Sequence, residues 1–352
     1  MGLDDLRKKI DKLDDDVIKL LNERTKIVLE IGKLKKSEGG QVYSPSRESE
    51  VYTKIDKENR GPLPSDALKS VYREIMSAAL SLEKQVKIAY MGPEASFSNL
   101  AALSKFGNSV EYVACDTIGD IFVEVDKGNA DYGVIPVENS IEGAVSHSLD
   151  MFIDYDLKIC NEIVFEINHN LLSNSALSSI KKVYSNPQVF AQCRAWLKAN
   201  LPKVEYIDTS STTVAAQRAT REEGSAAIAS KLASVIYNLN ILAESIEDSP
   251  HNATRFLVIG KGISEPTGSD KTSIVCSIKD KVGALYGIIQ PIFENGVNMT
   301  KIESRPSKKK AWDYYFFIDV EGHVYEEKIK KTLSQIEENV RLLKVLGSYP
   351  KQ

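Results

Sequence analysis

The strongest constraint on this 352-residue chain is a heptad-like repeat of apolar residues at its N-terminal end. Apolar side chains recur in alternating steps of three and four at Leu3, Leu6, Ile10, Leu13, Val17, Leu20, Ile27, Ile31 and Leu34. This spacing predicts one long helix over residues 3–36 with a single apolar stripe. At about 1.5 Å per residue, the helix would be roughly 50 Å long. Shorter helices later in the chain cannot cover that length, so we expect a second subunit to do so.

Arg24 interrupts this stripe where the repeat calls for another apolar side chain. A guanidinium there needs an anion, unless it fixes the register of paired helices or extends out of the stripe. Lys35 follows eleven residues later and, at about 100° per residue, returns to within about 20° of the same face. Arg7 lies about five turns away, so it could reach this face only from an antiparallel partner helix. The three cations favour an anion-binding site that a second subunit completes.

Two shorter helices are predicted to follow, over residues 46–57 and 65–83. The three helices carry Leu6-Arg7, Glu23-Arg24, Gly32-Lys33-Leu34-Lys35 and Arg47-Glu48 in an order and spacing that resembles the all-helical chorismate mutase domain, an intertwined three-helix dimer. The resemblance implies that the carboxylates of chorismate are held by Arg24, Arg47 and, from the other subunit, Arg7. It also implies that Lys35 faces the ether oxygen and that Glu48 binds the ring hydroxyl.

Two positions depart from the chorismate mutase pattern: Ala79 stands where serine is common, and Glu83 stands where many members carry glutamine. A carboxyl group can donate a hydrogen bond to the ether oxygen only when it is protonated. We therefore expect mutase activity to fall as the pH rises and Glu83 ionises. The alternative is a helical domain that has lost catalysis and serves only as a dimerisation arm.

After residue 86, short apolar runs alternate with helical patterns, which predicts an α/β domain with largely parallel sheets. The expected strands are residues 87–91, 110–114, 132–137, 182–184, 204–207, 226–229 and 255–259. Ligands of such sheets bind beyond the carboxyl ends of the strands, so polar motifs near the strand ends are candidate binding residues.

Four polar motifs lie at the ends of these strands. Gly92–Ser98 and Ser210–Thr212 each open a helix, where free N–H groups and hydroxyls can bind an anion, although each motif could be a plain N-cap. Pro136–Ser140 ends a strand with a carboxylate, an amide and a hydroxyl. Thr254 and Arg255 begin the last strand of the domain, where they could also be an ordinary β-branched residue and an ordinary ion pair.

Together with Asn186-Pro187-Gln188 and Gln192-Cys193, these ordered motifs closely resemble prephenate dehydratase from about residue 86 to 262. The resemblance implies two α/β lobes with prephenate between them and Thr254 nearest the leaving hydroxyl. The other residues that it implies as site lining are Glu138, Asn139, Ser140 and Gln192. The carboxylate-holding residues that it implies are Arg255, Ser96, Ser98, Ser211 and Thr212. Asn186 stands where many members have histidine, which argues against an essential imidazole there.

Aromatisation drives the dehydratase reaction, so a proton donor to the leaving oxygen is its main chemical need. A threonine hydroxyl is a weak acid, so Thr254 would donate a hydrogen bond, and Glu138 is the candidate for a true acid. A second possibility is a non-catalytic sensor of aromatic amino acids built on a two-lobed binding fold. The combination of Thr254, Glu138 and Asn139 favours the enzyme.

Residues 266–352 show the order strand, helix, strand, strand, helix, strand, the ferredoxin-like βαββαβ plan. Gly283-Ala284-Leu285 and Glu303-Ser304-Arg305-Pro306 resemble the ACT regulatory domain, which implies phenylalanine as a feedback effector. The expected effector site comprises Gly283, Ala284, Leu285, Asn298, Glu303, Ser304 and Arg305. A helix N-terminus at Gly283 could hold the carboxylate of the amino acid. Helices cover only one face of such a sheet, so its open face and edges could pair with a second copy, and the domain could serve dimerisation alone.

Composition argues against several other classes of protein. A net charge of −4 gives no reason to expect nucleic acid, and Lys308-Lys309-Lys310 is expected to be a solvated loop. No apolar run reaches the roughly 18 residues of a membrane span. The four cysteines and four histidines are scattered, which favours reduced thiols, a cytoplasmic protein, and neither a metal site nor a cofactor.

The sequence therefore predicts a multi-domain α and α/β enzyme. Its domains would be a dimerising helical domain at 1–85, a two-lobed domain at 86–265 and a ferredoxin-like domain at 266–352. The expected activity is a bifunctional isomerase and lyase of phenylalanine biosynthesis, working as a homodimer or tetramer.

Overall fold

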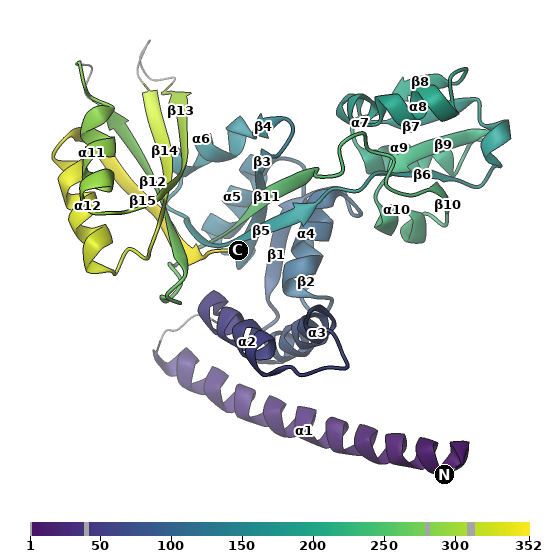
Figure 1. The fold of residues 1–352 in the computed structure, drawn as a ribbon, viewed down its shortest axis with the longest axis horizontal. Helices are drawn as coiled ribbons and strands as arrows, with labels where there is room; N and C mark the ends of the chain where they lie inside the picture. Colours follow the sequence, from purple (N-terminus) through teal and green to yellow (C-terminus); the bar gives the residue numbers. More distant parts are fainter. Residues whose placement is uncertain (1, 39–41, 279–281, 308–313) are drawn as a thin grey trace.

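Residues 2–38, 42–278, 282–307 and 314–352 are described by the computed structural model (Figure 1). A helical domain, two α/β lobes and a C-terminal domain follow one another along the chain. Lobe 1 lies in the centre and contacts each of the other three (Figure 1). The expected Lys308-Lys309-Lys310 loop lies outside the described residues, as does Trp312 in the third predicted strand of the C-terminal domain.

The helical domain consists of α1 (Leu3–Glu38), α2 (Pro45–Glu58) and α3 (Ser65–Glu83), as the periodicity predicted. The Ser44 side chain caps α2 by accepting from the Arg47 N–H, and Pro45 occupies the first turn, where it costs no hydrogen bond. A Cβ on Gly32 of α1 would lie 2.5 Å from the Glu83 side chain of α3, so only glycine allows this approach. The apolar stripe of α1 is exposed, with values from 43% at Leu6 to 64% at Leu3 and Leu34.

Lobe 1 is a mixed sheet in the order β2-β1-β3-β11-β5, with the short β4 paired to β3. Its strands are β1 (Lys87–Met91), β2 (Glu111–Cys115), β3 (Tyr132–Asn139), β4 (Gly143–Ala144), β5 (Lys158–Glu166) and β11 (Ala253–Gly260). Its helices are α4 (Phe97–Phe106), α5 (Ile118–Lys127) and α6 (Ser146–Asp154). The first three strands in sequence, β1 to β3, are parallel, whereas β11 is antiparallel to both of its neighbours.

Lobe 2 is a second mixed sheet in the order β10-β6-β9-β7-β8. Its strands are β6 (Asn170–Ser173), β7 (Lys182–Ser185), β8 (Glu205–Asp208), β9 (Ser225–Ala229) and β10 (Asn240–Ala243). Its helices are η1 (Leu177–Ser179), α7 (Pro187–Gln192), α8 (Arg194–Asn200), α9 (Thr212–Ala219) and α10 (Lys231–Ile236). The chain crosses between the lobes twice, after β5 and before β11, and at these crossings β6 and β11 are each antiparallel to both of their neighbours. The expectation of largely parallel sheets therefore holds only for three strands in each lobe.

The C-terminal domain has the expected βαββαβ order and a sheet arranged β13-β14-β12-β15. Its elements are β12 (Asp270–Ile278), α11 (Tyr286–Glu294), β13 (Met299–Pro306), β14 (Tyr314–Glu321), α12 (Glu327–Glu337) and β15 (Val340–Pro350). The face opposite the helices is not open, contrary to expectation, because Phe317 and Leu346 join Phe152 of lobe 1 in one apolar cluster. Gly347 permits the close approach, since a Cβ there would lie 2.0 Å from the Ile159 carbonyl oxygen.

Cysteines and possible metal ligands are also placed by the structure. All four cysteines are free and buried. Within the described ranges, no three His, Cys, Asp or Glu side chains are grouped as metal ligands would be. No helix in those ranges is long and apolar enough to cross a membrane.

Candidate functional sites

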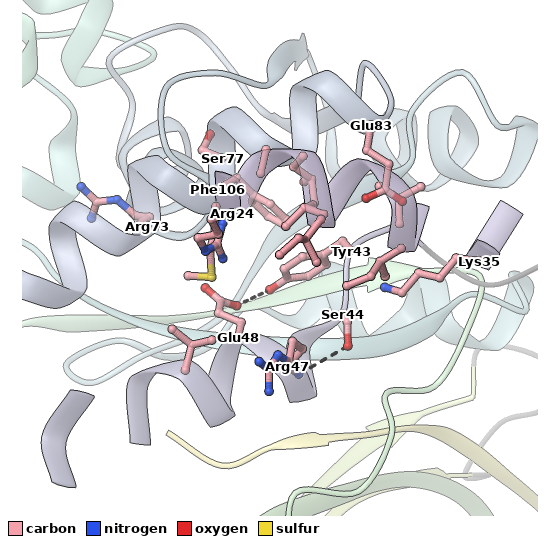
Figure 2. A pocket seen from close by; sticks show the side chains of 18 of the residues that line it. Arg24, Lys35, Tyr43, Ser44, Arg47, Glu48, Arg73, Ser77, Glu83 and Phe106 are labelled. Atoms are coloured by element: carbon pink, nitrogen blue, oxygen red, sulfur yellow. Dashed lines mark hydrogen bonds between the residues drawn. The ribbon is translucent and has the colours of Figure 1, made fainter. Parts of the chain in front are cut away.

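A cavity of about 310 Å³ lies between the three N-terminal helices and the end of α4 in lobe 1 (Figure 2). Its polar and charged lining consists of Arg24, Lys35, Tyr43, Ser44, Arg47, Glu48, Arg73, Ser77, Glu83 and Lys105. Apolar side chains, including Ile31, Leu80 and Phe106, line the remainder. The fold thus brings together five residues that the sequence singled out: Arg24, Lys35, Arg47, Glu48 and Glu83.

Arg24 and Glu83 each present a buried polar atom that lacks a hydrogen-bond partner in the described part of the chain. These atoms are Nη1 of Arg24 and Oε1 of Glu83, and both residues line the cavity. A buried polar group without a partner costs about 1–3 kcal/mol, and more when it is charged. An anionic ligand in the cavity would satisfy Arg24, so the lining is suited to a small molecule with carboxylates.

Glu48 is held by groups from two domains. Its Oε2 accepts a hydrogen bond from the Tyr43 hydroxyl at 2.7 Å and lies 2.9 Å from Nζ of Lys105 in α4. Burial, followed by the charge of Glu48, raises the pKa of Tyr43 well above its usual value, so Tyr43 remains a neutral donor. The carboxylate is only 6% exposed and is therefore fixed in position.

Arg7 and Arg47 differ from Arg24 in their surroundings. Arg7 lies on the exposed part of α1, 3.7 Å from Asp4, and does not line the cavity of its own chain. Arg47 lines the cavity, but its side chain is 73% exposed and lies 2.6 Å from Glu50. Surface ion pairs of this kind contribute about 0–1 kcal/mol, so Arg47 can exchange its partner at little cost.

A second group of polar side chains lies where lobe 1 meets lobe 2, and we call it the interlobe cluster. Its members are Asn139, Glu142, His169, Gln188, Gln192, Asn252 and Thr254. Glu142 of lobe 1 accepts hydrogen bonds from Gln188 at 2.6 Å and from Gln192 at 2.8 Å, both on α7 of lobe 2. One carboxylate therefore connects the two lobes.

Thr254 is the second residue of β11, lies beside Asn139 of β3, and is nearly buried at 9% exposure. The Asn139 side-chain amide donates to Thr254 Oγ1 at 3.0 Å and to Asn252 Oδ1 at 2.9 Å. Since Oγ1 accepts from Asn139, the Thr254 hydroxyl hydrogen remains able to donate elsewhere. The Ser140 hydroxyl instead bonds backbone groups of His251 and Ala253, so its role here is to hold β3 to the segment before β11.

His169, which sequence reasoning did not single out, is the most buried member of the cluster at 1% exposure. Its Nε2 lies 2.8 Å from Gln192 Oε1, while the Gln192 amide nitrogen donates to Glu142. This orientation of Gln192 makes Nε2 the donor, and it leaves the buried Nδ1 without a partner in the described part of the chain. Burial lowers the pKa of His169, so the ring is neutral. No sequence pattern pointed to His169, because a single histidine has no ligand-like spacing.

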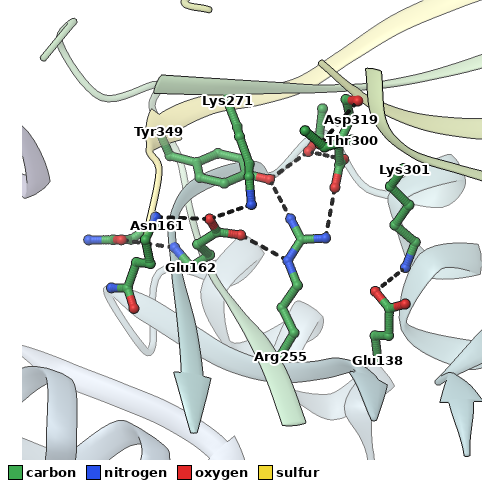
Figure 3. Close-up of polar contacts among 11 residues, drawn as sticks. Glu138, Asn161, Glu162, Arg255, Lys271, Thr300, Lys301, Asp319 and Tyr349 are labelled. Atoms are coloured by element: carbon green, nitrogen blue, oxygen red, sulfur yellow. Dashed lines mark hydrogen bonds and ion pairs between the residues drawn. The ribbon is translucent and has the colours of Figure 1, made fainter. Parts of the chain in front are cut away.

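Glu138 and Arg255 were expected to line the same site as Thr254, and the structure turns both away from it. Successive side chains on a strand point to opposite faces, so Glu138 and Arg255 face the C-terminal domain. Glu138 pairs with Lys301 of β13 at 2.8 Å. Arg255 bonds Glu162 at 2.8 Å and Asp319 at 2.7 Å (Figure 3). Neither side chain is available as an acid or a carboxylate holder in the interlobe cluster.

Arg255 and its partners form a balanced and largely buried network between lobe 1 and the C-terminal domain (Figure 3). Lys271 adds a second cation, 2.7 Å from Glu162, and the Tyr349 hydroxyl lies 3.0 Å from the Arg255 guanidinium. Two acids therefore face two bases, which is the arrangement that a buried ionic group requires.

The hydroxyl residues expected to bind carboxylates serve mainly local structure. Ser96 and Ser211 cap α4 and α9, which is the plain N-cap alternative. Asn186 caps α7 in the same way. Ser98 and Thr212 are buried on the first turns of α4 and α9. The Phe97 ring lies 5.4 Å from the His169 ring, so the start of α4 is adjacent to the interlobe cluster.

The expected effector residues are divided between two faces of the C-terminal domain. Gly283, Ala284 and Leu285 form the turn before α11, and Asn298 precedes β13. The side chains of Glu303 and Arg305 instead face lobe 1, where Glu303 lies 3.3 Å from Lys301 and Arg305 lies 3.2 Å from Asp150. Ser304 alternates with them on the edge strand β13 and is exposed. Glu303 and Arg305 are thus interface residues in this structure.

Three family models match the chain in succession. Residues 6–84 match the model for Chorismate mutase type II, residues 88–264 match Prephenate dehydratase, and residues 272–338 match the ACT domain. These matches follow the same order as the helical domain, the two lobes and the C-terminal domain.

Relatives that align with nearly the whole chain carry both activities in their names. The bifunctional chorismate mutase/prephenate dehydratase of Aquifex aeolicus is 51% identical over 99% of this chain and 98% of its own. The enzyme of the same name from Stutzerimonas stutzeri is 45% identical over 98% of this chain and 97% of its own. Among solved structures, prephenate dehydratase from Arthrobacter aurescens in complex with L-Phe aligns with a TM-score of 0.71 at 31% identity, covering 76% of this chain and 90% of that one.

Proposed function

This chain belongs to the bifunctional chorismate mutase/prephenate dehydratase family, and we propose that the helical cavity is its mutase site and the interlobe cluster its dehydratase site. The observation that carries the proposal is the buried, unpartnered Nη1 of Arg24 in a cavity that also contains Lys35 and Glu83. Such a lining suits a substrate that carries two carboxylates and an ether oxygen.

In the mutase site, Arg24 and Arg47 bind the carboxylates of chorismate, and Arg7 of a partner subunit joins them. The pericyclic rearrangement needs no nucleophile, so catalysis requires a held reactive conformer and donors directed at the ether oxygen, where negative charge grows. Lys35 and the carboxyl group of Glu83 supply these donors. Glu48 accepts a hydrogen bond from the ring hydroxyl. The position of Glu83 against Gly32, with a free Oε1, supports this role.

In the dehydratase site, Thr254 donates a hydrogen bond to the leaving hydroxyl of prephenate. The amide of Asn139 supports this role by donating to Thr254 Oγ1, which orients the hydroxyl. Neutral His169 and Gln192 line the opposite, lobe 2 side of the site. Loss of carbon dioxide then accompanies loss of water, and the ring becomes aromatic. Glu138, paired with Lys301, has no place in this scheme.

Phenylalanine is proposed as the effector of the ACT domain. The solved Arthrobacter aurescens dehydratase contains L-Phe, and this chain carries the corresponding domain. The turn at Gly283, Ala284 and Leu285, with Asn298, would hold the amino acid. Glu303 and Arg305 would transmit its binding, because their side chains face lobe 1. A ligand shifts activity only if it favours one arrangement of domains over another.

A homo-oligomer, either a dimer or a tetramer, is the proposed assembly. The uncovered stripe of α1 supports it, as does the exposed apolar surface of Val282, Tyr286 and Phe293 around α11. An antiparallel pair of α1 helices would bring Arg7 of one chain to the cavity of the other. We also propose domain limits at 1–85, 86–265 and 266–352, and a cytoplasmic location, in keeping with four free thiols.

The test is to give the purified chain chorismate and to follow prephenate and phenylpyruvate separately, with and without phenylalanine. The proposal expects both products, with phenylpyruvate suppressed by phenylalanine. If only added prephenate is converted, the helical domain serves assembly alone and the assignment of Arg24 is wrong.

A further inference from the structure

We propose that Lys105, a residue of the dehydratase domain, is a positioning residue of the chorismate mutase site that acts through Glu48. The inference rests on the proposed role of Glu48 in binding the ring hydroxyl of chorismate. It means that the helical domain does not contain the whole of its own active site.

Lys105 lies near the C-terminal end of α4, and its side chain enters the wall of the mutase cavity beside Phe106. The side chain is 10% exposed, and its Nζ lies 2.9 Å from Glu48 Oε2. Lysine side chains are rarely this buried without a functional or structural partner. Here the partner is a residue of another domain that lines the same cavity.

A second connection joins the same carboxylate to the dehydratase sheet. The Tyr43 hydroxyl donates to Glu48 Oε2 and accepts from the side-chain amide of Asn161 on β5 at 3.0 Å. Asn161 is 1% exposed, so it holds Tyr43 rigidly. Two contacts from lobe 1, one ionic and one through Tyr43, therefore set the position of Glu48.

The charges around Glu48 explain why a lysine is needed. Tyr43 and Tyr52 hydrogen-bond the carboxylate, while Arg24 of α1 and Arg73 of α3 line the same cavity. Arg73 forms an ion pair with Glu74 at 3.1 Å, and Arg24 is the proposed partner of a substrate carboxylate, so neither is available to pair with Glu48. Chorismate adds two negative charges near a carboxylate that is already buried, so this carboxylate needs a cation of its own. The ammonium of Lys105 supplies this charge and holds the Glu48 carboxylate where it can accept a hydrogen bond from the ring hydroxyl.

The experiment compares full-length variants for mutase and dehydratase activity separately. Lys105→Met removes the charge, Lys105→Arg retains it, and Glu48→Gln removes its partner. Lys87→Met is the matched control, because Lys87 is also a lobe 1 lysine paired with a glutamate, Glu111 at 3.0 Å, but lies outside both sites. Added prephenate reports dehydratase activity, and thereby the fold of lobe 1, in every variant.

We expect Lys105→Met to lower mutase kcat/KM at pH 7 by roughly tenfold, as for the loss of one charge-assisted hydrogen bond, with Lys105→Arg retaining most of it. In the double variant Lys105→Met/Glu48→Gln, mutase activity should equal that of Glu48→Gln alone. Dehydratase activity and the Lys87→Met control should remain near wild type.

Two outcomes would overturn the inference while leaving the mutase assignment in place. One is a Lys105→Met variant as active as Lys87→Met while Glu48→Gln is impaired. The other is a double variant whose losses multiply, which would make Lys105 independent of Glu48. If Glu48→Gln itself leaves mutase activity unchanged, the proposed role of Glu48 is wrong, and the role of Lys105 falls with it.

Discussion

Thr254 and Arg255 are consecutive residues of β11, yet their side chains serve different parts of the molecule. The Thr254 hydroxyl accepts from Asn139 in the interlobe cluster, whereas the Arg255 guanidinium bonds Asp319 of the ACT domain. A rotation or shift of this strand would therefore affect both sites together. The ACT domain is therefore connected to the interlobe cluster through one ion pair and one peptide bond.

Thr254→Val should abolish most of the dehydratase activity, because the substitution removes the only hydrogen that the side chain can donate to the leaving oxygen. A loss of about 100-fold or more is expected, in the range of positioned proton donors. Mutase activity, measured on chorismate, should stay near normal. Equal loss of both activities would indicate misfolding or coupling between the two sites.

Glu83→Ala should lower mutase activity on chorismate, because it removes the side chain that we propose donates to the ether oxygen. Glu83→Gln should retain most of the activity, since an amide of nearly the same shape can also donate a hydrogen bond. A Glu83→Ala variant as active as the wild type would argue against this role.

Arg255→Met should destabilise the contact between lobe 1 and the ACT domain by about 3–5 kcal/mol, because Asp319 and Glu162 would lose a buried cation. Chemical denaturation would measure the loss, with the exposed Arg194→Met as the control. Inhibition by phenylalanine should also weaken. Unchanged stability combined with a higher KM for prephenate would instead make Arg255 a carboxylate holder, as the motif resemblance implied.

The free energy of unfolding should fall as the pH drops below about 6.5, the ordinary pKa of histidine, partly because of His169. Burial lowers the pKa of His169 in the folded chain. Between that lowered pKa and about 6.5, the unfolded chain therefore binds more protons than the folded one, and stability is lost as pH falls. Urea denaturation of wild type and His169→Gln from pH 5 to 7.5 should show a shallower loss in the variant. Identical slopes would mean that His169 is charged in the folded protein.

Much of the fold was predictable because local signals agree with it. The first three helices have the expected limits to within two residues, since apolar periodicity, Pro45 and Ser44 all favour them. Strand β5 was missed because Asn161 and Glu162 interrupt its apolar run. Asn161 is buried against Tyr43 of the helical domain, and Glu162 against Lys271 of the ACT domain, and no local pattern reveals either contact.

Only part of each candidate site was predictable, because contacts between domains leave no local pattern in the sequence. Arg24, Glu48 and Glu83 meet in one cavity, as the resemblance implied. Glu138 was expected beside Thr254 because it adjoins Asn139 in the sequence. Side chains of consecutive strand residues point to opposite faces, so Glu138 lies outside the interlobe cluster. Lys105 could not have been found, because its contact with Glu48 depends on how two domains pack.

The ACT domain rests on lobe 1 (Figure 1). Its polar contacts in the described part of the chain include Glu138, Asp150, Glu162 and Arg255 of lobe 1 and no residue of lobe 2. The two lobes are joined by two crossing segments, one between β5 and β6 and one between β10 and β11. Of the two lobes, the ACT domain packs against lobe 1 only, in the part of the chain that the structure describes. It therefore does not act on lobe 2 directly. Any inhibition that it exerts on a site between the lobes must be transmitted through lobe 1 or along β11.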